Sequence, residues 1–246
     1  MKKQKKGFIF RVVRKYFDIT FPNMKMVGLE NIPEEPCMIV GNHSQLNGPL
    51  TGELRLPFAR TMWYSGDLTD KNLYPEYAMN DFWRYKSKRL TWFYKIMAQV
   101  TKPIFPYLLK YVDGIPVYKD NKIILTFKKS VETLNSGKHL VVFPECHTPY
   151  NHIVNEFQPG FVDLAKLYYK KTGKCLSFVP MYICRKLKST FFGKPVVFDP
   201  NVPLEEQRTA IIEELKKRIT DIATEQPVHK VIPYANIKKK KYPKNK

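Results

Sequence analysis

Short apolar runs alternate with longer amphipathic stretches along this chain. The apolar runs, which predict strands, lie at residues 26–29, 37–40, 115–118, 140–143 and 176–183. Stretches with apolar residues at helical spacing lie at residues 7–20, 122–135, 161–169 and 204–223. The alternation predicts one α/β domain, a sandwich in which helices flank a mixed, partly parallel central sheet.

Length and local composition suggest how the domain is divided. The 246 residues suit a single large domain. We expect a basic amphipathic N-terminal helix within residues 1–25 and a main domain over 26–225. An aromatic and basic helical insertion is expected at about 60–112, with helical patterns over 76–112 that Pro103 and Pro106 interrupt. The lysine-rich tail, residues 226–246, is expected to be disordered.

Three of the predicted strands carry candidate site residues at or near their ends. Asn42-His43 comes after the run at 37–40, and Glu145-Cys146-His147-Thr148 comes after the run at 140–143. The third run contains Val179-Pro180. The carboxyl ends of parallel strands meet at one edge of a sheet, so we expect a reactive site there.

Four short blocks in a fixed order carry a resemblance. They are Asn42 to Gly48, Gly114 to Lys119 (G-I-P-V-Y-K), Phe143 to Pro149 (F-P-E-C-H-T-P) and Val179-Pro180. This order resembles the glycerolipid acyltransferase superfamily, including the bacterial 1-acylglycerol-3-phosphate acyltransferases, over roughly residues 27 to 200. The family patterns are N-H-x-x-x-x-D, G-I-P-V-x-R, F-P-E-G-x-R-S and V-P. The family aspartate falls on Gly48, and its two arginines fall on Lys119 and Thr148.

The resemblance implies a glycerol-3-phosphate acyltransferase-like fold and an O-acyltransferase activity. His43 is then the general base, which removes the proton of a hydroxyl as it attacks an acyl thioester. Asn42 and Glu145 are predicted to belong to the same catalytic site. The acceptor or its phosphate is expected at Gly114, Lys119, His147 and Thr148. Glu53, Glu145 and Asn47 are the candidates to orient His43 in place of the missing aspartate.

The donor is expected to be a fatty acyl thioester on coenzyme A or on acyl carrier protein, acting as a co-substrate, with no bound cofactor. No metal site is expected, because the histidines at 43, 147 and 152 match no closed zinc spacing and the cysteines form no C-x-x-C pair. A nucleophilic pair of Cys146 and His147 is a further alternative, although adjacency in sequence does not give the geometry it needs.

The charge of the chain indicates the kind of surface it meets. Forty-two basic and twenty-two acidic residues give a net charge of +20. Aromatic and basic residues alternate around Trp83, Arg84, Trp92 and Phe93, a combination typical of the headgroup layer of a membrane. No apolar run approaches the ~20 residues that cross a bilayer. We therefore expect a peripheral protein on the cytoplasmic face of the cell membrane, taking part in phospholipid metabolism.

Two other functions remain open at this stage. Gly48 and Thr148 favour a catalytically impaired member of the fold that binds lipid or acyl chains. A nucleic-acid-binding protein is favoured only by charge and aromatic residues, and nucleic acid is not the expected partner because no RNP, KH, zinc-finger or helix-turn-helix signature is present.

Overall fold

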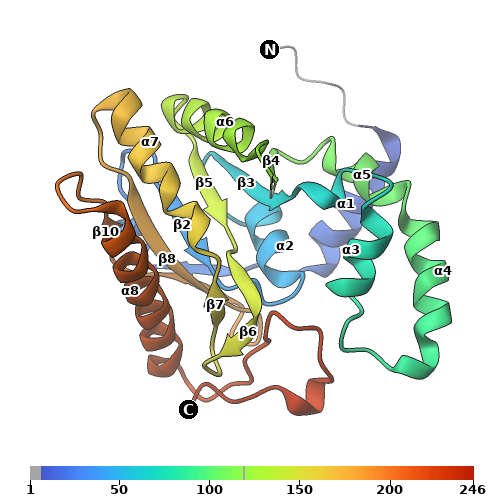
Figure 1. Cartoon of the computed structure of the whole chain (residues 1–246). Helices are drawn as coiled ribbons and strands as arrows, with labels where there is room; N and C mark the ends of the chain where they lie inside the picture. Colours follow the sequence, from blue (N-terminus) through green and yellow to red (C-terminus); the bar gives the residue numbers. More distant parts are fainter. Residues whose placement is uncertain (1–6, 119) are drawn as a thin grey trace.

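The structure, a computed structural model, describes residues 7–118 and 120–246, with the backbone alone for residues 147–150. Its centre is an eight-stranded sheet (Figure 1). Seven strands follow the order β1-β9-β8-β2-β5-β3-β4, and β10 pairs with β8. The strands are β1 (Lys25–Val27), β2 (Met38–Gly41), β3 (Arg60–Ser65), β4 (Gly114–Val117), β5 (His139–Val142), β8 (Ser177–Cys184), β9 (Ser189–Phe192) and β10 (Val196–Val197).

The sheet is mixed, as the sequence predicts. Strand β2 lies parallel to β5 and β8, and β3 lies parallel to β4 and β5. Only the pairings of β9 and β10 with β8 are antiparallel within this sheet as described. The expected α/β sandwich with a partly parallel central sheet is therefore confirmed. A separate hairpin pairs β6 (Glu145–Tyr150) with β7 (Asn155–Phe157).

Alternation along the buried strands divides the core between the two faces of the sheet. Met38 and Val40 of β2 point into one cluster, while Ile39 between them points into the other. The first cluster is covered by α6 (Ile123–Asn135), α7 (Asp163–Thr172) and α8 (Leu204–Glu225). The second includes residues that flank α1 (Phe8–Thr20) and α2 (Asn47–Leu54). Helices thus flank a sheet that is buried on both faces.

The segment expected to be a helical insertion begins with a strand. Arg60–Ser65 forms β3, which lies between β5 and β4, so the helical part starts only after it. The helices that follow are α3 (Tyr74–Asn80), α4 (Thr91–Thr101) and α5 (Ile104–Leu109). They share a small core of their own around Tyr74, Ala78 and Ala98.

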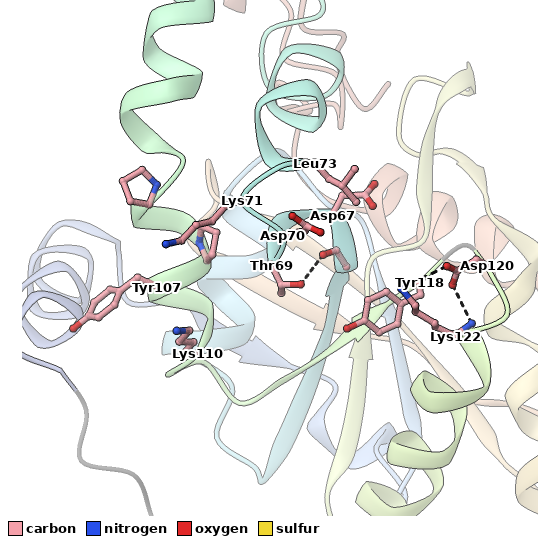
Figure 2. A pocket seen from close by; sticks show the side chains of 13 residues that line it. Asp67, Thr69, Asp70, Lys71, Leu73, Tyr107, Lys110, Tyr118, Asp120 and Lys122 are labelled. Carbon is pink, nitrogen blue, oxygen red and sulfur yellow. Dashed lines mark hydrogen bonds and ion pairs between the residues drawn. The ribbon is translucent and has the colours of Figure 1, made fainter.

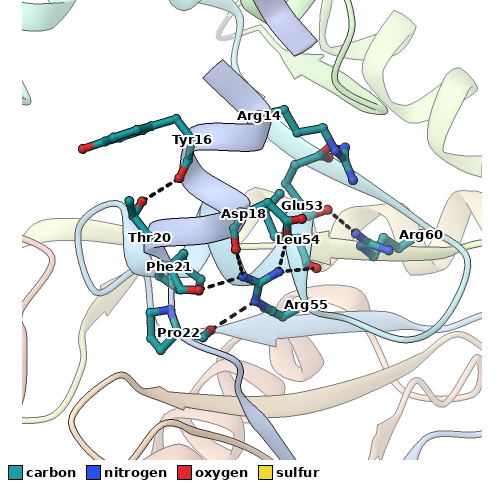
Figure 3. Close-up of polar contacts among 10 residues, drawn as sticks. All are labelled: Arg14, Tyr16, Asp18, Thr20, Phe21, Pro22, Glu53, Leu54, Arg55 and Arg60. Atoms are coloured by element: carbon teal, nitrogen blue, oxygen red, sulfur yellow. Dashed lines mark hydrogen bonds and ion pairs between the residues drawn. The ribbon is translucent and has the colours of Figure 1, made fainter. Parts of the chain in front are cut away.

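Helix α1 is attached to the end of α2 by polar contacts (Figure 3). The Arg55 guanidinium donates to the carboxylate of Asp18 at 2.5 Å, to the carbonyl of Phe21 at 2.7 Å and to that of Pro22 at 3.1 Å. Arg14 of the same helix pairs with Glu53. The polar contacts dock α1 on the domain and leave much of its apolar side exposed.

The C-terminal tail, expected to be disordered, is packed against the domain. Val231 is buried in the larger core cluster, and the backbone N–H of Val231 donates to the carbonyl of Pro243 at 2.9 Å. The Asn245 side chain is also buried and donates to the carbonyl of Ala223, in α8, at 2.8 Å. The lysines at 238–241 are exposed, as their charge suggests. The expectation of a disordered backbone is wrong, because hydrogen bonds hold this segment against the domain.

Candidate functional site

His43 lies just beyond the carboxyl end of β2, at the edge where the parallel strands end. The residue before it, Asn42, is buried and fixes this end to β8. Its side-chain amide donates to the carbonyl of Ile183 at 3.2 Å and accepts from the N–H of Ile183 at 2.6 Å. Asn42 therefore holds the start of the loop that carries His43.

The loop after His43 turns through a backbone conformation that side-chain-bearing residues rarely adopt. Ser44 and Gln45 both have positive φ, 47° and 56°. The turn brings the carbonyl oxygen of Gln45 to 2.5 Å from Nδ1 of His43. A carbonyl oxygen can only accept, so Nδ1 carries the proton and Nε2 keeps its lone pair. This tautomer is the one that a base acting through Nε2 requires.

Glu145 ties the histidine loop to the hairpin. Its buried carboxylate accepts from the backbone N–H of His43 at 2.5 Å and from that of Asn155 at 2.8 Å. Burial raises the pKa of Glu145 to about 7, against the two backbone hydrogen bonds, which lower it. The side chain of Glu145 therefore fixes the backbone of two segments, the histidine loop and β7, and its pKa is unusually high for a carboxyl group.

Gly48 has no room for a side chain. A Cβ at this position would lie 2.6 Å from the backbone oxygen of His43 and 2.9 Å from the ring of Phe143. The N–H of Gly48 itself donates to that oxygen at 2.9 Å. The close approach of backbone to backbone explains the glycine, and an aspartate cannot be restored here without moving His43.

The three residues proposed to orient the imidazole are engaged elsewhere. Glu53 pairs with Arg14, and the Asn47 amide donates to the carbonyl of Ser44 at 2.7 Å. Glu145 bonds the backbone of His43 rather than its ring. The Gln45 carbonyl holds Nδ1 instead.

Side chains from distant parts of the sequence complete the surroundings of His43. The ring of Tyr234 lies 5.0 Å from the imidazole, centre to centre, and that of Phe143 lies 5.6 Å away. The hydroxyl of Tyr234 donates to Asp81 at 2.5 Å. Burial lowers the pKa of His43, while the charge of Asp81 and the bond to the Gln45 carbonyl raise it. Asp81 and Tyr234 carry no motif, and no pattern in the sequence separates them from their neighbours.

The residues predicted to bind the acceptor are only partly described. Lys119 and the side chains of His147 and Thr148 lie outside the described residues. Gly114 begins β4, at the opposite end of this strand from Lys119, and a Cβ there would meet the ring of Tyr64 at 2.5 Å. Its position favours a packing role over contact with an acceptor at the carboxyl edge.

An open cavity of about 800 Å³ lies at the carboxyl ends of β3 and β4 (Figure 2). Tyr118 and Asp120, the neighbours of Lys119, line it. The charged side chains around it are Asp67, Asp70, Lys71, Lys110, Asp120 and Lys122. Both signs of charge therefore face the same space.

The described residues bear on a metal site, which the sequence did not predict, and on the alternative of a Cys146–His147 pair. Among the described residues, no group of three histidine, cysteine, aspartate or glutamate side chains could hold a metal ion. The Sγ of Cys146 lies 3.1 Å from the carbonyl of Glu156, to which it donates. The partner proposed for Cys146, the His147 side chain, is outside the described part of the chain.

The residues predicted to meet a membrane fall into two groups. Trp92 and Phe93 are exposed on α4, and Arg84 is exposed before it. Trp83 is half-buried and stacks on Tyr94, with 5.7 Å between the ring centres, so it belongs to the core of the insertion. In the described residues, no helix is long and apolar enough to cross a membrane.

Comparison with known proteins finds likeness in shape. No family model matches the chain, and no curated protein matches its sequence. Among solved structures it is similar to the crystal structure of the 1-acyl-sn-glycerophosphate (LPA) acyltransferase PlsC from Thermotoga maritima, with 17% sequence identity and a TM-score of 0.49. The match covers 89% of this chain and 81% of that one.

Proposed function

We propose that this protein is an O-acyltransferase that moves a fatty acyl group from a thioester to a hydroxyl of a lysophospholipid or related acceptor. The observation that carries the proposal is the bond from Nδ1 of His43 to the Gln45 carbonyl. It leaves Nε2 as a proton acceptor at the carboxyl ends of the parallel strands β2, β5 and β8, in the first of four motif blocks that stand in family order. The sequence resemblance supplies the reaction type.

The proposed reaction needs one base and returns its proton. Nε2 of His43 takes the proton of the acceptor hydroxyl while its oxygen attacks the thioester carbonyl carbon. The carbon–sulfur bond then breaks, and the leaving thiolate takes the proton back from the imidazolium. Burial that lowers the pKa of His43 keeps the imidazole neutral, and ready to accept, at neutral pH. Asn42 and Glu145 act in this scheme by positioning the loop.

The cavity beside β3 and β4 is the proposed place of the acceptor headgroup. Its lysines suit a phosphate, and its aspartates suit an ammonium group, so a zwitterionic headgroup satisfies both. Acceptors of this kind do not require the bidentate arginine that the family carries where Thr148 stands here. We therefore expect a zwitterionic lysophospholipid to be used at least as well as lysophosphatidate.

The proposed site of action is an anionic membrane surface on the cytoplasmic side. Apolar residues of α1 and α4 are exposed, including Phe8, Ile19 and Trp92, and basic residues lie on the same helices or next to them. Interfacial binding by such helices scales with the apolar area buried and with attraction to anionic lipid. The acyl donor, on coenzyme A or on acyl carrier protein, would meet the lysolipid there.

The test is turnover of a labelled acyl thioester in the presence of a panel of lysophospholipids and alcohols. His43→Asn should lower product formation by at least about 10²- to 10⁴-fold, the contribution typical of a general base. His152→Asn is the matched control, because His152 is exposed and asparagine tolerates its positive φ of 74°. Equal activity in the two variants would remove the catalytic assignment of His43.

The altered motif favours one rival, a lipid-binding protein without turnover. Gly48 removes the family carboxylate from the base. This rival predicts that wild-type protein binds lysolipid or acyl thioester in an equilibrium assay while forming no product with any acceptor of the panel.

A further inference from the structure

The residues that follow α8 form a loop that is closed at its base. Beside the bond from Val231 to Pro243, the N–H of Asn245 donates to the carbonyl of His229 at 3.1 Å. The side chain of His229 is itself held by the hydroxyl of Tyr182, 2.7 Å away in β8. We call residues 231–243 the C-terminal loop. Its ends are fixed to the sheet and to α8, and its middle extends to other parts of the domain.

The middle of the C-terminal loop lies over the histidine loop. Besides the contact of Tyr234 with the imidazole, the Gln45 side chain donates to the hydroxyl of Tyr242 at 2.9 Å. The carbonyl of the same Gln45 accepts from Nδ1 of His43. The C-terminal loop therefore touches both the imidazole and the residue that sets its tautomer.

The C-terminal loop also reaches Asp81, at the end of α3. The hydroxyl of Tyr234 donates to one oxygen of Asp81. Next to them, the Asn236 amide donates to the carbonyl of Phe82 at 2.8 Å. The Tyr234 hydroxyl thus holds the Asp81 carboxylate, and the ring of the same tyrosine packs against His43.

We propose that Asp81 is the carboxylate that stabilises the imidazolium of His43, and that Tyr234 of the C-terminal loop is the positioning residue that keeps Asp81 in place. The inference rests on the proposed acyl transfer, in which His43 becomes positive. A negative charge nearby favours the protonated ring and so strengthens the base. The Gln45 carbonyl already occupies Nδ1, so the Asp81 carboxylate acts by its charge and through Tyr234, which contacts both groups.

Other titratable groups also lie near His43, and the experiment must separate their effect on its pKa from that of Asp81. Glu145 meets its backbone from β6, and Tyr234 meets its ring from the C-terminal loop. Burial, and then the charge of Asp81, raise the pKa of both Tyr77 and Tyr234, so these hydroxyls stay protonated as donors at neutral pH. A change in the titration of His43 must therefore be assigned between Asp81 and Glu145.

The experiment is an NMR titration of the His43 ring without substrate, in wild type, Asp81→Asn, Glu145→Gln and Tyr234→Phe. Asp81→Asn should lower the pKa of His43 by about half a unit or more, since it removes the stabilising charge. Tyr234→Phe keeps the ring, removes the hydroxyl and should give a smaller shift in the same direction. Asp221→Asn, on the exposed side of α8, is the charge-matched control and should leave the titration unchanged.

Kinetics give a second readout. In Asp81→Asn, kcat for acyl transfer should fall by roughly 3- to 30-fold, and the acid limb of its pH profile should move to lower pH, with partial recovery in Asp81→Glu. An unchanged His43 titration in Asp81→Asn overturns the role of Asp81, and one unchanged in Tyr234→Phe overturns the role of Tyr234. If no thioester turns over in wild type, the proposed function fails while the titration still decides the coupling.

Discussion

At the scale of single residues, the loop that follows His43 is constrained by backbone conformation and by lack of space for a side chain. Its turn needs positive φ at Ser44 and Gln45, and its return needs a bare backbone at Gly48. These requirements place the Gln45 carbonyl on Nδ1. A backbone oxygen therefore performs the orienting task for which a carboxylate is the familiar solution.

Gly48→Ala should damage the loop. The added Cβ would collide with the His43 backbone oxygen and the Phe143 ring, so we expect a loss of about 1–3 kcal/mol in the free energy of unfolding and a large loss of turnover. Urea unfolding and thioester turnover measure the two effects. Gly160→Ala is the matched control, because a Cβ added there would meet nothing within 4 Å. Equal stability of the two variants would show that the loop has room.

The raised pKa of Glu145 predicts a pH dependence of stability. Between its ordinary value of 4.5 and about 7, the folded protein binds a proton that the unfolded chain has released. Stability from this group is present at low pH and is lost as pH rises through that window, by about 3 kcal/mol in total.

The measurement is the free energy of unfolding of wild type and Glu145→Gln from pH 4.5 to 8. The glutamine variant lacks this titration. As pH rises, the free energy of unfolding of wild type should therefore fall relative to that of Glu145→Gln. A difference that stays constant over this range would contradict the assigned pKa.

At the scale of elements, the two exposed helices differ in how the domain holds them. Helix α1 is fixed to the end of α2 through Arg55, while α4 packs on α3 within the small core of the insertion. Both leave apolar side chains uncovered within the described chain. Exposed apolar side chains beside basic ones are what interfacial binding requires.

Val100→Ser on α4 should weaken binding to anionic vesicles. Losing a buried valine side chain at the interface removes about 1 kcal/mol or more, which is a severalfold weaker partition. Val228→Ser is the matched control, since Val228 is 60% exposed and Val100 is 56% exposed, but Val228 lies after α8. Co-sedimentation measures both, and an equal loss in the two variants would argue against α4 as the contact.

The sequence predicts the elements that have continuous apolar or amphipathic patterns. It does not predict elements whose polar side chains make hydrogen bonds to groups distant in the sequence. Strand β3 was overlooked because Arg60, Thr61 and Ser65 break its apolar run. In the structure Arg60 donates to the carbonyls of Glu53 and Leu56, and Thr61 donates to Asp113. His43 could be located because a strand and a motif share its position, whereas Asp81 and Tyr234 reach the site only through tertiary packing.

At the scale of the whole molecule, the net charge of +20 governs encounters with other surfaces. Binding to anionic vesicles should fall steeply between 0.1 and 1 M salt, because the screening length falls from about 10 Å to about 3 Å. Flotation of vesicles with and without anionic lipid measures the effect. If binding does not depend on salt or on lipid charge, the affinity comes from the apolar side chains alone. Tighter binding to RNA than to vesicles would favour the nucleic-acid alternative.

The position of Tyr234 in the chain has a consequence for biosynthesis. His43 and the whole eight-stranded sheet precede the C-terminal loop, and a ribosome adds about 5–20 residues per second. A nascent chain can therefore fold its sheet for several seconds before Tyr234 emerges to meet Asp81 and the imidazole. During this interval the sheet is formed while the surroundings of His43 are incomplete, so the candidate site is finished only after the sheet.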